Sequence, residues 1–84
     1  MAKINAWGAK EVARVKRTFT LEDGTVVTQH KVLCSDGRIL KKASYRESDG
    51  RRHSTGYTIV CKTIATPDSW MAAQLLNGWK RDDS

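Results

Sequence analysis

The chain has 84 residues, of which 39% are hydrophobic and 29% charged, and it carries a formal net charge of +6 with a pI near 9.7. This size and composition are typical of a small globular protein, so we expect residues 1–84 to form a single domain. No apolar run approaches the ~20 residues that a membrane helix needs, and residues 1–8 lack the apolar stretch of a secretory signal. We therefore expect a cytoplasmic protein with no membrane partner, and the surplus of positive charge favours a polyanionic partner such as nucleic acid.

Most of the chain has the pattern of β-strands. We expect residues 1–9 to form an irregular N-terminal arm. From Lys10 to Leu21, apolar and polar side chains alternate with a period of two, which is typical of a half-buried strand. Further strand patterns follow, at 25–34, 38–47 and 56–64. Residues 10–64 therefore predict an antiparallel β-meander of three to four strands.

Asp-Gly pairs separate these strands, and their glycines are 13 residues apart, at Gly24, Gly37 and Gly50. Asp-Gly is a strong signal for a two-residue type I′ hairpin turn, in which both central residues have a positive φ. Such turns fix the register of the strands that they join. With two-residue turns after the first and second strands, the register predicts that Lys16, Lys31 and Lys42 lie in one row on one face of the sheet.

The C-terminal part of the chain predicts a helix over residues 66–78. Thr66 is a suitable N-cap, Pro67 fits the first helical position, and Gly78 is placed to end the helix. One apolar stripe at helical spacing is expected to pack on the sheet face opposite the lysine row, formed by Met71, Ala72, Leu75, Leu76 and Trp79. Residues 80–84 are polar and predict a frayed tail.

The predicted fold class is α+β, with an antiparallel three- to four-stranded β-meander and one C-terminal helix packed on one face. The fourth strand is the least constrained part of this fold. If the loop after Gly50 were two residues long, Tyr57, Ile59 and Cys61 would lie on the basic face. We favour a longer loop over 51–55, because it places these three apolar side chains in the core and leaves an exposed arginine-rich tip.

No pattern of catalytic residues stands out. His30 and His53 are the only histidines, and the carboxylates lie mainly in turns and near the helix, so we expect a non-enzymatic protein without a cofactor. The two cysteines, Cys34 and Cys61, are expected to be reduced and buried. A zinc site made of these four residues is disfavoured, because His30 and Cys34 would be ~13 Å apart along one strand.

The basic face of the sheet is the candidate site. We expect a set of Lys and Arg side chains to contact the phosphates of a nucleic acid, DNA rather than RNA: Arg14, Lys16, Lys31, Lys42, Arg46, Arg51 and Arg52. A three-stranded meander followed by a helix that opens TPDSWMAAQLL is similar in layout to the integrase N-terminal DNA-binding fold. The resemblance implies that the sheet docks into the major groove, and it identifies no individual residue.

A protein partner is the alternative. Four apolar side chains are expected on the same outer face as the lysines: Val12, Val27, Leu33 and Leu40. An apolar patch surrounded by charge is typical of a protein interface. The chain would then be an interaction module or an inhibitor, such as a phage accessory protein, that binds an acidic surface of a host or partner protein through this face or through an edge strand. A homodimer through an edge strand or the outer face belongs to the same alternative.

Overall fold

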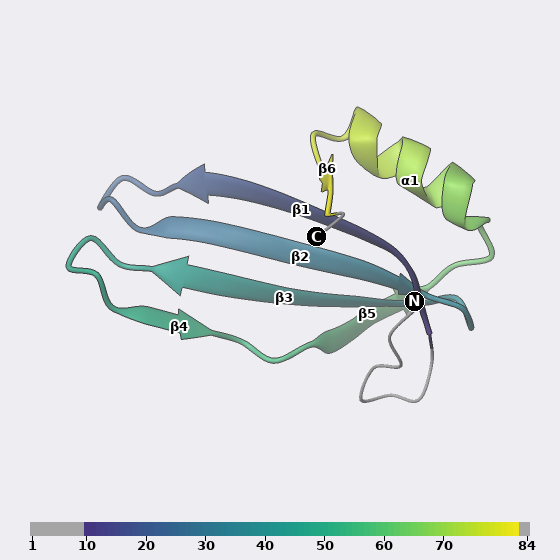
Figure 1. Ribbon diagram of the computed structural model, residues 1–84, viewed down its shortest axis with the longest axis horizontal. Helices are drawn as coiled ribbons and strands as arrows, with labels where there is room; N and C mark the ends of the chain where they lie inside the picture. Colours follow the sequence, from purple (N-terminus) through teal and green to yellow (C-terminus); the bar gives the residue numbers. More distant parts are fainter. Residues whose placement is uncertain (1–9, 83–84) are drawn as a thin grey trace.

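A computed structural model of the protein describes residues 10–82, so the expected arm at 1–9 lies outside the described residues. The chain forms a mostly antiparallel sheet followed by one helix near its C-terminal end, which confirms the predicted α+β fold class (Figure 1). The elements are β1 (Glu11–Thr20), β2 (Val26–Cys34), β3 (Arg38–Arg46), β4 (Arg52–Ser54), β5 (Thr58–Lys62), α1 (Pro67–Leu76) and β6 (Lys80–Arg81).

The strands are ordered β4-β3-β2-β1-β6, and β5 pairs with β3 beside β4. Figure 1 shows β4 and β5 one after the other along the outer edge of β3. The predicted strand over 56–64 corresponds to β5, whereas the prediction of a loop over 51–55 is wrong, because β4 lies within it. Arg52–Ser54 pairs with the end of β3, and Thr58–Lys62 pairs with its beginning, because the long β3 offers room for two short partners.

Each of the three Asp-Gly turns has a three-residue loop, so the prediction of two-residue type I′ turns is wrong. Gly24, Gly37 and Gly50 have φ values of 90°, 91° and 93°, and no non-glycine residue among 10–82 has a positive φ. A type I turn followed by a left-handed glycine is the usual three-residue hairpin. In the first turn, the Gly24 amide donates to the Leu21 carbonyl at 3.0 Å, and the same bond recurs in the other two turns.

The aspartates complete these turns. The Asp23 Oδ1 atom accepts a hydrogen bond from the Thr25 amide at 2.9 Å, and Asp36 and Asp49 accept in the same way at 3.0 Å. The backbone donors hold the pKa of Asp23 and Asp36 below its usual value, because they stabilise the charged carboxylate. Residues 35–38 and 48–51 share the sequence SDGR, and both stretches form the same turn with the same hydrogen bonds.

The additional loop residue changes which side chains share a face. Lys16 pairs with His30, and His30 pairs with Lys42, whereas Lys31 pairs with Val15 and Lys41. The predicted row of Lys16, Lys31 and Lys42 is therefore wrong. A one-residue change in register turns every side chain of β2 to the opposite face, while β1 and β3 keep their predicted orientation.

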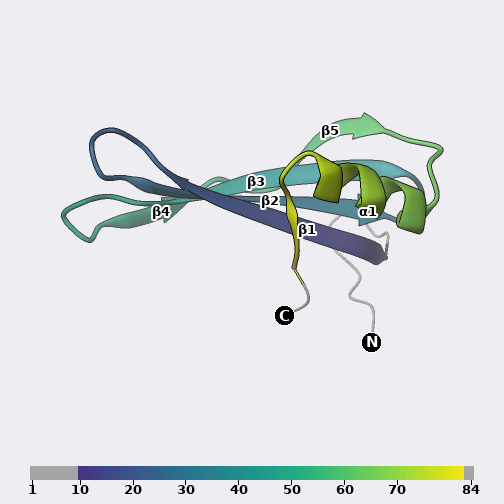
Figure 2. The ribbon, with the colours of Figure 1, turned by 90° about the horizontal axis from the view of Figure 1, so that it is seen from above.

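The helix defines the two faces of the sheet. On the helix face, Trp70, Met71 and Trp79 pack with side chains from three strands, namely Val15, Leu33 and Ile39. The other face, called the open face below, presents Arg14, Lys16, His30, Lys42, Arg46 and Arg52 in β1 to β4. A smaller cluster on the open face contains Val32, Cys34 and Leu40, with Tyr57 packed against it. Figure 2 shows α1 on one side of the sheet and the C-terminal end on the other.

The predicted outer apolar patch is wrong, because Leu33, Leu40 and Val27 are buried, with exposed fractions of 2%, 1% and 3%. The register explains the error for β2, since Leu33 and Val27 lie on the helix face. Leu40 lies on the open face but inside the cluster with Tyr57. Only Val12 of the predicted patch is exposed.

The fourth predicted strand differs from the expected core strand. Ile59 pairs with Leu40 and Cys61 with Ile39, and an irregularity between these pairs places the two side chains on opposite faces. Ile59 is 46% exposed, and Cys61 is exposed, because β5 is a short edge strand. Tyr57 alone is partly buried, whereas Cys34 is buried as predicted.

The helix starts as predicted, since the Thr66 hydroxyl accepts a hydrogen bond from the Ser69 amide at 3.2 Å. It ends at Leu76, and Gly78 follows with a φ of 89°. The predicted stripe is wrong for most of its members: Leu75 and Leu76 are 40% and 88% exposed, and Ala72 is exposed, whereas Trp70 is buried. The reason is that Gly78 reverses the chain, so Trp79 reaches the core from outside the helix.

The residues after the helix join the sheet. Lys80 and Arg81 pair with Lys16 and Val15, and Asp82 is buried. The predicted frayed tail is therefore wrong for 80–82, and residues 83–84 lie outside the described part of the chain. The chain reversal brings a polar segment to the edge of β1, whose backbone groups offer hydrogen bonds that the sequence pattern does not reveal.

Candidate nucleic-acid interface

The structure brings most of the predicted site residues to one face. The open face carries Arg14, Lys16, Lys42, Arg46 and Arg52, and these side chains come from β1, β3 and β4. Lys31 lies on the helix face, and Arg51 lies in the third turn. The sequence therefore predicted a shared basic face from β1 and β3 correctly, and it assigned the side chain from β2 to the wrong side.

Lys31 is engaged with the segment around the end of the helix. Its Nζ atom donates to Gln74 Oε1 at 2.8 Å and lies 4.3 Å from the centroid of the Trp79 ring. Burial lowers the pKa of Lys31, and the nearby charges of Lys41 and Arg17 lower it further. Lys31 thus helps to hold α1 and the following loop against the sheet.

Arg51 is neutralised within its own turn. Its Nε atom lies 2.7 Å from Asp49 Oδ2 and 3.0 Å from Glu47 Oε2. A guanidinium with two carboxylate partners adds little net positive charge to the surface. The prediction that Arg51 contacts phosphate has no support from this geometry.

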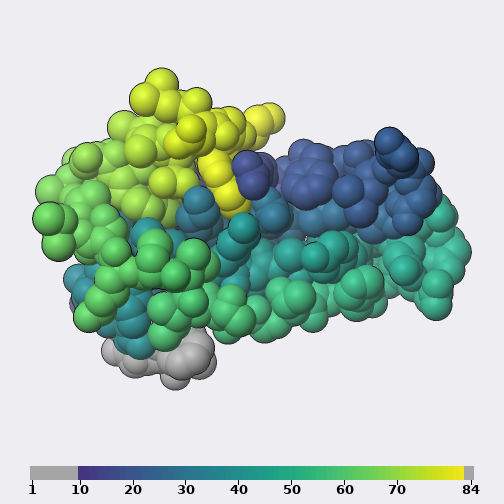
Figure 3. Space-filling model, turned by 180° about the vertical axis from the view of Figure 1, so that it is seen from behind, coloured from purple at the N-terminus to yellow at the C-terminus, as the bar shows by residue number. Residues whose placement is uncertain are grey.

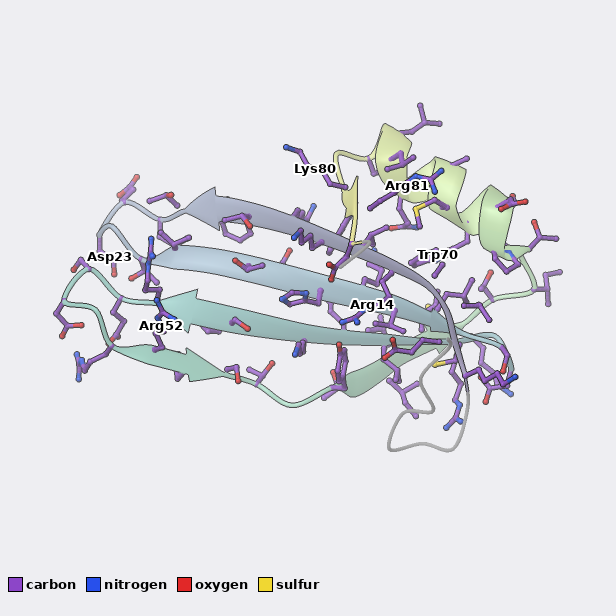
Figure 4. All side chains as sticks on the ribbon, viewed as in Figure 1. Arg14, Asp23, Arg52, Trp70, Lys80 and Arg81 are labelled. Carbon is purple, nitrogen blue, oxygen red and sulfur yellow. The ribbon has the colours of Figure 1, made fainter. Side chains whose placement is uncertain are left out.

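An open groove lies at the end of the open face that is farthest from the helix. Figure 4 shows Arg52 at this end, near Asp23 of the first turn and away from Trp70. Arg46 and Arg52 are cross-strand partners there. The groove has a volume of about 630 Å³, and its walls include Val26, Thr28, Ser44, Tyr45, Arg46, Arg52, His53 and Ser54. Among residues 10–82, no carboxylate lies within ion-pair distance of either arginine. The groove is therefore lined by hydroxyl groups, by an apolar side chain and two rings, and by two guanidinium groups with no carboxylate partner among residues 10–82.

The middle of the open face is partly neutralised by Asp82, which β6 delivers. Its carboxylate lies 3.5 Å from His30 Nδ1 and 3.9 Å from both Arg14 Nη2 and Lys16 Nζ. The Asp82 side chain is only 6% exposed. Sequence reasoning missed this residue because it lies in the segment predicted to fray, and no local signal marks it.

Lys42 lies in the same cross-strand row as Lys16 and His30, but no carboxylate of residues 10–82 lies within ion-pair distance of it. Its Nζ atom is 4.9 Å from the centroid of the Tyr57 ring, which is a cation–π distance. The positive potential of the open face is therefore concentrated at Lys42, Arg46 and Arg52. Like charges on cross-strand partners such as Arg46 and Arg52 cost about 0.2–1 kcal/mol, and a bound anion relieves that repulsion.

No protein-family model, curated protein or solved structure matches this chain. Within residues 10–82, no group of three or more His, Cys, Asp or Glu side chains is placed to hold a metal ion. The helix of the described region is too short to cross a membrane.

Proposed function

We propose that the protein binds nucleic acid, and DNA in particular, through its open face. The observation that supports this best is the pair of arginines, Arg46 and Arg52, side by side in an open groove without a carboxylate partner in the described chain. Guanidinium groups bind phosphate oxygens with two parallel hydrogen bonds, which suits the backbone of DNA. Lys42 and Lys16 extend the positive surface along the strands.

The shape of the sheet is compatible with this role. Lys42 and Arg46 are four residues apart on β3, so they are separated by roughly 13 Å along the strand. The helix packs on the opposite face and leaves the open face at the groove accessible in the described structure (Figure 2). A sheet face with cations along its strands can contact the phosphates that border a groove of the duplex.

The test is duplex DNA binding across a salt series. Four phosphate contacts, from Lys16, Lys42, Arg46 and Arg52, give an expected slope of log K against log salt near −3.6, since each contact contributes about −0.9. The variant Arg46→Gln/Arg52→Gln should flatten the slope by about 1.8 and weaken binding at low salt. Circular dichroism verifies that the variant folds.

The matched control is Arg51→Gln/Lys80→Gln, which removes the same charge outside the groove. It should leave the slope close to that of the wild type. If the two double variants weaken binding equally, binding follows net charge and the groove is not the site. If the wild type binds neither duplex nor single-stranded nucleic acid at low salt, the proposed function is wrong.

The edge of β5 favours a second candidate, a protein interface. Ile59 and Val60 are 46% and 55% exposed, and in residues 10–82 no strand pairs with the outer edge of β5. Exposed apolar edges pair with strands of other chains, including a second copy. Sedimentation over a concentration series tests self-association, which Val60→Lys should abolish. A monomer at every concentration contradicts pairing between copies.

A further inference from the structure

We propose that the helix face, at the end that α1 leaves bare, stacks the unpaired bases of a single-stranded nucleic acid. The stacking surface is a cross-strand row made of Phe19, Val27, Tyr45 and His53, called the aromatic row below. This inference rests on the proposed nucleic-acid binding and adds a second surface with a different specificity. It uses none of the residues that contact phosphate on the open face.

The rings of the aromatic row are partly accessible. Phe19 is 41% exposed, and the rings of Tyr45 and His53 are stacked, with centroids 4.8 Å apart and planes at 18°. Val27, between Phe19 and Tyr45 in the row, is 3% exposed. Figure 3, which views the helix face, shows α1 over one end of the sheet and the strands of the other end uncovered. Aromatic rings held at an accessible surface of a sheet can stack with bases.

Cations adjoin the aromatic row on the same face. Arg17 lies one row closer to the helix, and its position is fixed by a 2.7 Å hydrogen bond to Gln29 and by the Trp79 ring at 4.4 Å. Lys31 and Lys41 lie in the next row. The described chain offers no carboxylate within ion-pair distance of these three cations.

The spacing suits a nucleotide. Adjacent rows on one face are two residues apart along the strand, or roughly 6.8 Å, so a phosphate near Arg17 would place its base over the aromatic row. Burial lowers the pKa of Lys31 most, and the positive charges of Lys41 and Arg17 lower it further. A bound phosphate would relieve the repulsion among these three cations. Bases in a duplex are stacked on each other, so only an unpaired strand can use this surface.

The experiment measures how tightly two oligonucleotides bind to the wild type, to a variant that lacks a ring, and to a control variant. Fluorescence anisotropy measures binding of labelled oligothymidylate and of a duplex of the same length, at one salt concentration. The variant Phe19→Leu keeps an apolar side chain beside Val27 but removes the one ring of the row that does not line the groove of the open face. It should weaken binding of oligothymidylate about tenfold or more and leave duplex binding within about twofold. Leu75→Ala/Leu76→Ala, which trims exposed side chains on the helix, is the control and should change neither affinity.

Three outcomes overturn the inference. If the ring variant binds oligothymidylate as well as the wild type, while Arg46→Gln/Arg52→Gln weakens duplex binding, base stacking is wrong and the proposed function stands. If polyglutamate competes as well as oligothymidylate, the surface recognises acidic chains, including those of proteins, and not bases. If the wild type binds neither oligonucleotide at low salt, the inference fails together with the proposed function.

Discussion

Gly37 and Gly50 occupy the same place in two turns of identical sequence, yet their surroundings differ. Both have a left-handed φ, of 91° and 93°. A Cβ atom on Gly37 would lie 2.5 Å from the Thr63 carbonyl oxygen, whereas a Cβ atom on Gly50 would meet nothing within 4 Å. The segment after β5 crosses the second turn, where the Thr63 amide donates to the Gly37 carbonyl at 2.8 Å.

The two glycines therefore predict unequal costs of substitution. Gly50→Ala should destabilise the protein by about 1–2 kcal/mol, because only the left-handed backbone is strained. Gly37→Ala should cost at least about 1 kcal/mol more, since a backbone atom must also move. Urea unfolding of both variants measures the difference. If both variants lower the free energy of unfolding equally, the backbone at Thr63 moves away from the new Cβ atom without an energetic cost.

At the scale of elements, β6 connects the helix to the open face. Two residues of β6 pair with β1, and the next residue, Asp82, sits among Arg14, Lys16 and His30. This carboxylate lies 3.9 Å from the cationic groups of Arg14 and Lys16, which would otherwise repel one another. The same carboxylate opposes the approach of phosphate to the middle of the open face.

Asp82→Asn should therefore have two opposite effects. The free energy of unfolding should fall by about 1 kcal/mol, because Arg14, which also lies 3.6 Å from Glu11, and the half-exposed Lys16 lose a charged partner. The affinity for duplex DNA should rise, because the open face gains net positive charge. Denaturant unfolding and anisotropy measure the two effects. Asp68→Asn makes the same charge change at the start of the helix and should leave the affinity near that of the wild type. A drop in affinity for Asp82→Asn would contradict the proposed site.

At the scale of the whole molecule, packing is uneven along the sheet. The chain extends over 40 × 28 × 24 Å. Both buried clusters include β2 and β3 residues near the second turn, whereas β4 is exposed throughout. The helix end thus contains the core, and the other end is a single layer whose two faces carry the groove and the aromatic row. The stable end anchors the surfaces that we propose bind nucleic acid.

Hydrogen exchange should follow this gradient. Amides of β2 near Val32 and Leu33 should exchange slowest, because opening them requires disruption of both clusters. Amides of β4 should exchange faster by orders of magnitude, because local opening exposes almost no apolar surface there. Exchange followed by NMR on the native protein measures both. Similar protection in β2 and β4 would show that the sheet opens only as one unit.

The sequence by itself determined the local features of this protein. Period-two alternation placed β1 to β3, the Asp-Gly pairs placed the turns, and Thr66 placed the start of the helix, because each of these depends on a few neighbouring residues. The shared face of Arg14, Lys16, Lys42 and Arg46 was predictable for the same reason, since side-chain direction alternates along a strand.

Only the tertiary structure decided which parts meet. Whether a turn has two or three loop residues depends on the φ of a single aspartate, yet it sets the face of every side chain in β2, and so separates Lys31 from Lys16 and Lys42. The course of the chain after Gly78 decided that Trp79 is core and that Asp82 enters the basic face. The turn length depends on one backbone angle that the Asp-Gly pattern leaves open. The course of the chain after Gly78 depends on contacts between distant segments, which a local sequence pattern does not encode.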